Sequence, residues 1–214
     1  MQFPLRIRIG KGSLAHVIDV HDPSGARVAQ ARYGWWRLKV AVAVCADEAG
    51  QSPIGSIETD DIIDFAGTYR LLGPSGQLVG RSRRQGVKSL FRVRHQIDDG
   101  SDEAGWLLRE ERPWVRFLDS ALGRIPVLGM FAGYVFNPTY LVCRGDTPIA
   151  RLRQLRSFWE SDFALDRLSP VDGEAELRLL LAMLTFLVVE RTSRARVALP
   201  GGGGGTIDHG AVWR

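Results

Sequence analysis

Hydrophobic and polar residues alternate along most of the chain, which is the pattern of β-strands that turn one face to a core and the other to water. The clearest alternating runs are residues 5–9, 38–44 and 91–97. Turn sequences rich in proline, glycine and polar residues separate such runs, as at residues 22–25 and 73–76. The spacing predicts roughly ten to twelve short antiparallel strands, arranged as a sandwich or a barrel.

One C-terminal segment breaks this alternation. Residues 179–189 form eleven consecutive positions without a charge, and they are rich in leucine, which favours a helix. Asp172 can cap the start of this helix, and Glu174 and Glu176 suit its first turn. We therefore predict a helix over about residues 174–190 that is apolar on all sides, and such a helix must be surrounded on all sides.

The expected fold is therefore mainly β: a closed antiparallel barrel of about twelve strands that encloses the C-terminal apolar α-helix. Closure of the sheet buries the helix and removes most unpaired strand edges. The alternative is a helix embedded in a membrane, but the apolar run spans only about 16 Å against a hydrocarbon core of about 30 Å. We assign one domain to residues 1–196 and a flexible glycine-rich tail to residues 197–214.

The composition is that of an ordinary folded protein. The chain has 214 residues, of which 45% are hydrophobic and 24% are charged, and these values exclude global disorder. Cys45 and Cys143 both lie in apolar runs, so we predict buried thiols rather than a disulfide framework. Because we find no N-terminal signal and no apolar run of about 18 residues, we expect a cytoplasmic protein without a transmembrane span.

No catalytic signature stands out. The four histidines are scattered, and no pair has the spacing of a helical metal site. Neither a nucleophile elbow nor a glycine-rich phosphate loop occurs. The acidic residues within 98–103 lack the spacing of an EF-hand, so we predict a solvated hairpin tip there. We therefore predict no catalytic residue, no cofactor and no metal, and a protein that is not an enzyme.

Three features occur in order along the chain. They are the hairpin at Asp22-Pro23-Ser24-Gly25 with its echo at residues 73–76, the late strand pair 137–142 and 148–152, and residues 162–165 followed by an acidic cap and the apolar helix. Together they resemble the tubby C-terminal-like superfamily, which includes tubby proteins, phospholipid scramblases and LURP-one-related proteins, over roughly residues 3–194. The resemblance implies a twelve-stranded barrel around a C-terminal helix and a tendency to bind anionic membranes. The cysteine cluster of the scramblases has no counterpart here, and no phosphoinositide-binding residue of tubby matches a position in this chain.

The sharpest local feature is a basic segment, residues 81–94. It carries six basic residues and no acid, although the net charge of the whole chain is only +4; the six are Arg81, Arg83, Arg84, Lys88, Arg92 and Arg94. Arginine side chains suit bidentate contacts with phosphate oxygens, so we predict that this segment binds anionic lipid headgroups. The alternatives are a merely solvated outer face and a nucleic-acid surface, and the latter favours more interleaved aromatic residues than Phe91 alone.

Two further segments are candidate membrane contacts. Trp35 and Trp36 form the densest aromatic cluster, and residues 125–136 are uncharged and include Met130 and Phe131. Amphipathic aromatic rings suit the headgroup level of a bilayer, whereas the alternative for both segments is ordinary packing in the core.

The sequence thus favours a non-enzymatic, scramblase-like module that binds anionic phospholipids peripherally, at the inner face of the membrane. The rival interpretation is a protein-interaction or structural module with a protein partner and no lipid ligand. A nucleic-acid-binding protein that uses the same arginines is the third.

Overall fold

The computed structural model describes residues 1–11, 15–34, 42–47, 49–59, 67–84, 94–99, 105–111, 138–155 and 161–197. The strands are β1 Leu5–Lys11, β2 Ala15–His21, β3 Arg27–Gly34, β4 Val42–Cys45, β5 Pro53–Thr59, β6 Thr68–Leu72, β7 Leu78–Arg84, β8 Arg94–Asp98, β9 Trp106–Glu110, β10 Thr139–Arg144, β11 Thr147–Gln154 and β12 Ser161–Arg167. The helix that follows them is α3, Gly173–Val197.

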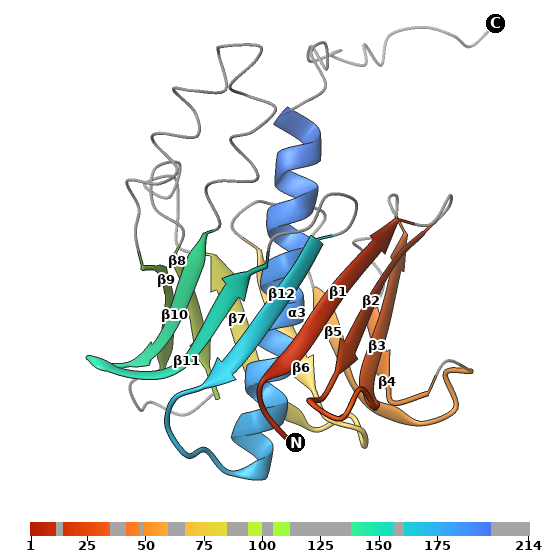
Figure 1. The fold of residues 1–214 in the computed structure, drawn as a ribbon, viewed down its shortest axis with the longest axis horizontal. Coiled ribbons are helices and arrows are strands. Elements are labelled where there is room, and N and C mark those ends of the chain that lie inside the picture. Colours follow the sequence, from red (N-terminus) through yellow and green to blue (C-terminus); the bar gives the residue numbers. More distant parts are fainter. Residues whose placement is uncertain are drawn as a thin grey trace, which may run out of the picture.

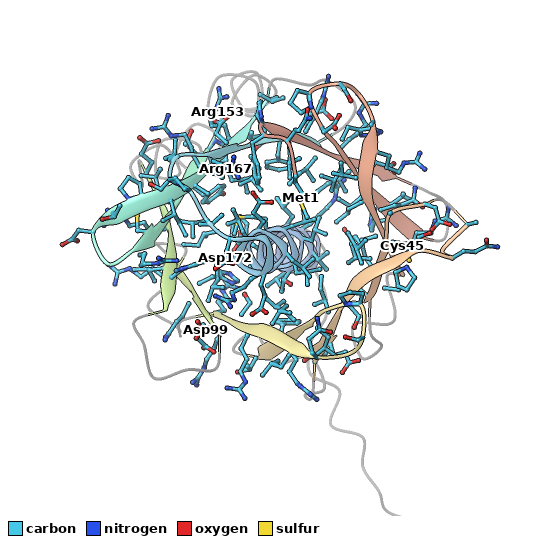
Figure 2. The ribbon with its side chains drawn as sticks, turned by 90° about the horizontal axis from the view of Figure 1, so that it is seen from below. Met1, Cys45, Asp99, Arg153, Arg167 and Asp172 are labelled. Atoms are coloured by element: carbon cyan, nitrogen blue, oxygen red, sulfur yellow. The ribbon has the colours of Figure 1, made fainter. Side chains whose placement is uncertain are left out.

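The strands close into one barrel. Each strand pairs antiparallel with its neighbours in the sequence, and β1 pairs with β12 to complete the ring. Figure 1 shows α3 running through the barrel and continuing beyond the strand ends. Figure 2, which looks along the helix, shows the strands as a ring around it. The predicted fold, a closed antiparallel barrel of about twelve strands around a C-terminal helix, is confirmed.

Strand β1 shows how alternation defines the two faces of the wall. Leu5, Ile7 and Ile9 point into the barrel and are at most 2% exposed. The side chains of Arg6 and Arg8 lie on the outside, where they are about half exposed. This follows from the two-residue period of a strand, so the apolar pattern of the sequence marks the interior directly.

The hairpin between β2 and β3 has the turn chemistry that the sequence predicts. The Asp22 carboxylate accepts hydrogen bonds from the backbone N–H groups of Ser24 at 2.9 Å and Ala26 at 3.1 Å. Hydrogen bonding by the Ser24 side chain also holds the pKa of Asp22 below its usual range. Gly25 has φ of 84°, a conformation that glycine adopts without strain. These bonds fix the turn and therefore the register of the two strands.

Helix α3 is buried on every side along its apolar run. Every residue from Leu179 to Val189 is at most 6% exposed, as the sequence predicts. Asp172 caps the helix, because its carboxylate accepts a hydrogen bond from the backbone N–H of Ala175 at 2.7 Å. The helix extends to Val197, past the predicted end near residue 190, since the first strong helix breaker after the apolar run is Pro200. Within the part of the chain that the structure describes, no helix combines the length and hydropathy needed to cross a membrane.

Arg178 ties the first turns of α3 to the barrel wall. Its Nε donates a hydrogen bond to the Val79 carbonyl at 2.5 Å, and its guanidinium stands 5.4 Å from the centre of the Trp106 ring. The same group reaches the Asp99 carboxylate at 3.4 Å. A nearly buried cation needs such partners, so these contacts set how deeply the helix sits in the barrel.

The strands alternate in direction, so the connections fall into two groups. At the end where α3 begins, short turns such as residues 22–26, 73–77 and 145–146 join the strands. At the other end, where α3 leaves the barrel, lie the C-terminal ends of β1, β3, β7 and β9 and the N-terminal end of β8. We call this second end the helix-end rim.

Gly55 allows β5 to approach both its neighbouring strand and the helix. A Cβ atom at this position would lie 2.6 Å from the Leu72 carbonyl oxygen and 3.1 Å from the nearest methyl group of Leu181. The first distance is a clash with backbone, which cannot move aside cheaply. Gly55 is therefore a packing requirement of the barrel rather than a turn residue.

We expect Gly55→Ala to lower the free energy of unfolding by about 1–3 kcal/mol, because it overpacks the contact between β5, β6 and α3. Gly173→Ala is the matched control, since a Cβ there meets nothing within 4 Å. The control should leave stability unchanged or raise it by up to about 1 kcal/mol. Urea unfolding of both variants provides the measurement, and equal stabilities would contradict this account of the packing.

Candidate phosphate-binding surface

Four arginines project outward from three adjacent strands on one side of the barrel. Arg81 and Arg83 lie on β7, Arg94 on β8 and Arg109 on β9, and all four are exposed. We call these four residues the arginine surface. Their common outward direction follows from alternation, since Ser82, between the first two, is buried.

The strand register brings three of these arginines together near the helix-end rim. Arg94 lies directly opposite Arg109, and Arg83 lies opposite Gln96, two residues along β8 from Arg94. Opposite residues in antiparallel strands have Cβ atoms about 4.5–5.5 Å apart, and diagonal neighbours about 7–8 Å. Arg81 is opposite Asp98 instead, so an acid faces it. Positive charge is therefore most concentrated at Arg83, Arg94 and Arg109.

The arginine surface differs from the outer faces of β1 and β11 in how its charges are paired. On β1, Arg6 and Arg8 reach the Asp162 carboxylate at 2.5 and 3.4 Å, and Arg153 on β11 reaches Asp166 at 2.8 Å. Among the described residues, none of the four members of the arginine surface makes an ion pair. Like charges placed directly opposite each other destabilise a sheet, so an anion bound between Arg94 and Arg109 would relieve this repulsion.

Arg109 is absent from the residues singled out in the sequence, because it lies outside the continuous basic segment 81–94. The signal was nevertheless present in the alternation of β9. Trp106, Leu108 and Glu110 are buried, so Arg109 must point outward from the same strand. The hairpin that joins β8 to β9 then places it opposite Arg94.

The structure separates Arg84 from the predicted phosphate-binding residues. Arg83 and Arg84 are consecutive in one strand, so their side chains point to opposite faces. Arg84 points inward, its side chain is 14% exposed, and its guanidinium lies 3.9 Å from the Glu190 carboxylate on α3. Of the predicted phosphate-binding residues on β7, Arg81 and Arg83 thus share the outer face and Arg84 does not.

The remaining predicted site residues lie outside the described residues. These are Lys88 and Arg92, the aromatic pair Trp35 and Trp36, and Met130 and Phe131 in segment 125–136. All six belong to connections between strands whose ends meet at the helix-end rim: β7 to β8, β3 to β4, and β9 to β10.

Buried polar groups line the inner side of the same rim. His95, Glu110 and Glu190 are each at most 8% exposed. Among the described residues, neither ring nitrogen of His95 has a hydrogen-bond partner, and its ring packs edge-to-face against Phe186 with centroids 5.2 Å apart. Burial, together with the charge of Arg84, lowers the pKa of His95 to about 3. His95 is thus a neutral core residue at physiological pH, and alternation in β8 is what turns it inward.

No family model, no curated protein and no solved structure matches the chain. In the described ranges, no group of three or more histidine, cysteine, aspartate or glutamate side chains could hold a metal ion. The fold defines the class, a mainly β protein whose closed antiparallel barrel encloses a C-terminal helix, and the site is described by its own residues.

We expect the stability of the protein to fall as the pH drops below about 6.5, in part because of His95. The unfolded chain takes up a proton on this imidazole near its ordinary pKa of 6.5, whereas the folded protein does so only near pH 3. Between these values the unfolded state binds more protons, so lower pH favours unfolding. At pH 4.5 this effect corresponds to about 3 kcal/mol.

His95→Phe, which keeps an aromatic ring against Phe186, should remove this part of the pH dependence. The measurement is the difference in free energy of unfolding between pH 7 and pH 4.5, for the wild type and the variant. His21→Phe, at a half-buried position at the end of β2, controls for the introduction of a phenylalanine. An unchanged pH dependence in His95→Phe would contradict the assignment.

Proposed function

We propose that this protein binds the phosphate groups of anionic phospholipids at a membrane surface and catalyses no reaction. The observation that carries the proposal is the arginine surface. Arg83, Arg94 and Arg109 are clustered, exposed and, among the described residues, not paired with acids. Guanidinium groups bind phosphate oxygens with two parallel hydrogen bonds, and a headgroup provides the counter-charge that the wall itself lacks there.

We infer that the helix-end rim is the end of the barrel that faces the membrane. Arg83, Arg94 and Arg109 lie near this rim, and the connections that contain Trp35, Trp36, Met130 and Phe131 join strands at the same rim. A peripheral protein combines basic groups for the headgroups with apolar groups for the interface below them. We therefore place the helix-end rim towards the lipid and the short turns at the opposite end away from it.

The tubby-like resemblance supports the same function. It implies a barrel threaded by a C-terminal helix, which is the architecture of this chain, together with a tendency towards anionic membranes. Membership of that superfamily, a scramblase-like role and a location at the cytoplasmic face of the membrane are parts of the proposal. Lipid attachment through a cysteine cluster is not, since Cys45 and Cys143 are both buried.

Two other functions compete for the same surface. A nucleic acid also presents phosphates, but the described outward residues around the arginine surface include no aromatic side chain on which a base could stack. A protein-interaction module without a lipid ligand would use the arginines only for solubility. Among the described residues, Arg83, Arg94 and Arg109 make no ion pair with an acid, which favours a phosphate ligand over that second alternative.

Binding to vesicles tests the proposal. We expect the wild type to sediment with vesicles that contain about one-fifth phosphatidylserine, but not with neutral vesicles, and to bind less as salt is raised. The triple variant Arg83→Gln/Arg94→Gln/Arg109→Gln should bind roughly 100-fold more weakly, because each basic residue near the surface contributes about 1 kcal/mol.

The matched control removes the same charge elsewhere on the outer wall. Arg8, Arg32 and Arg153 lie on β1, β3 and β11, away from β7 to β9 in the ring. The variant Arg8→Gln/Arg32→Gln/Arg153→Gln should keep most of the binding. If both triple variants lost the same amount of vesicle affinity, net charge alone would explain the effect, and the proposed binding site would be overturned. Displacement by duplex DNA at equal phosphate concentration would favour the nucleic-acid alternative.

A further inference from the structure

A cavity of about 240 Å³, partly open to solvent, lies between α3 and the barrel wall near the helix-end rim. It separates residues 186–191 of α3 from the strands on one side of the ring, β1, β10, β11 and β12. The helix packs more closely against β5, β6 and β7 on its other side, where Gly55 permits the near approach. The cavity is thus the space that remains because the helix leans towards one half of the barrel.

Most of the cavity wall is apolar. Its apolar lining residues, each at most 8% exposed, are Ile9, Tyr140, Phe163, Phe186 and Leu187. Such walls favour hydrocarbon over water. A water molecule takes up roughly 30 Å³ in the liquid; with a similar volume for each methylene group, the space corresponds to a chain of about eight carbons.

One part of the wall carries polar groups from α3 and β11. Arg191, Glu190 and Gln154 line the cavity there. The Arg191 Nη1 atom is buried and has no hydrogen-bond partner among the described residues, which is costly for a charged donor. The neighbouring Glu190 carboxylate makes no hydrogen bond with this Nη1 atom. Instead, the Glu190 carboxylate lies 3.9 Å from the guanidinium of Arg84. The guanidinium of Arg191 can therefore donate hydrogen bonds to a negatively charged group of a ligand, at the polar end of an apolar space.

We propose that this cavity binds a medium-chain monocarboxylate, a free fatty acid of about eight carbons, with its chain among the apolar residues and its carboxylate at Arg191. The carboxylate satisfies the buried guanidinium by charge-assisted hydrogen bonds. This site is separate from the arginine surface, because its residues lie inside the barrel wall and those of the arginine surface lie outside it.

Calorimetry with octanoate, butanoate and 1-octanol tests the site in the full chain. We expect saturable binding of one octanoate, tighter than butanoate because the longer chain fills the cavity. Arg191→Gln should weaken octanoate binding about tenfold or more, since a hydrogen bond to a charged group is lost. The same variant should change the affinity for 1-octanol by less than about twofold, because the alcohol carries no charge.

Leu187→Phe fills the cavity and should weaken both octanoate and 1-octanol. Thr185→Val is its control, because Thr185 lies on the side of α3 that faces Val42, Ile57 and Tyr69. A second measurement uses the wild type, so that the test does not depend on the folding of a core variant. Nuclear Overhauser contacts should join the octanoate chain to the methyl groups of Ile9 and Leu187.

Absence of saturable octanoate binding, full binding by a folded Leu187→Phe variant, or contacts to outer residues alone would overturn the proposal. Displacement of octanoate by neutral phospholipid vesicles would overturn the choice of a free acid over a membrane acyl chain. The variant Arg83→Gln/Arg94→Gln/Arg109→Gln should bind octanoate like the wild type, so this site and the proposed lipid function can fail independently.

Discussion

The burial of α3 is the constraint on which the rest of the structure depends. From Leu179 to Val189 the helix has no polar face to turn towards water, so protein must surround it. A closed sheet is an arrangement that surrounds a helix and pairs its own edges at the same time. The apolar inner faces of the strands, the cap at Asp172 and the close approach at Gly55 all follow from enclosing this one segment.

The enclosed helix also gives the two ends of the barrel different chemistry. At its start, Arg178 is held by Val79, Asp99 and Trp106, which fixes the depth of the helix. At its end, the helix leans away from β1 and β10 to β12, and the charges of Glu190 and Arg191 enter the interior. Polar groups and the arginine surface therefore gather at the helix-end rim, inside and outside the same wall, and both proposals arise there.

The fold was largely predictable because its signals are local. Alternation marked the faces of the strands, the Asp22 turn carried its own hydrogen bonds, and the uncharged run marked the core helix. The site was only partly predictable, because residues that are consecutive in a basic segment do not all point to the same face of the barrel. Alternation turns Arg84 inward beside Arg83, and the β8–β9 register adds Arg109 from outside the segment. The cavity depends on the position of α3 relative to the two halves of the barrel, and the periodicity of hydrophobic residues in the sequence does not indicate that position.

The central claim is that the arginine surface faces the lipid, and the most direct measurement places a fluorophore beside it. Gln96 is exposed between the arginines, so a label on Gln96→Cys tests that face, and a label on Arg32→Cys tests β3, which lies across the ring. The native cysteines are buried. With anionic vesicles that carry a headgroup-bound quencher, we predict quenching of the label at position 96 and little quenching at position 32. Equal quenching at both positions, or quenching at position 32 alone, would contradict the account.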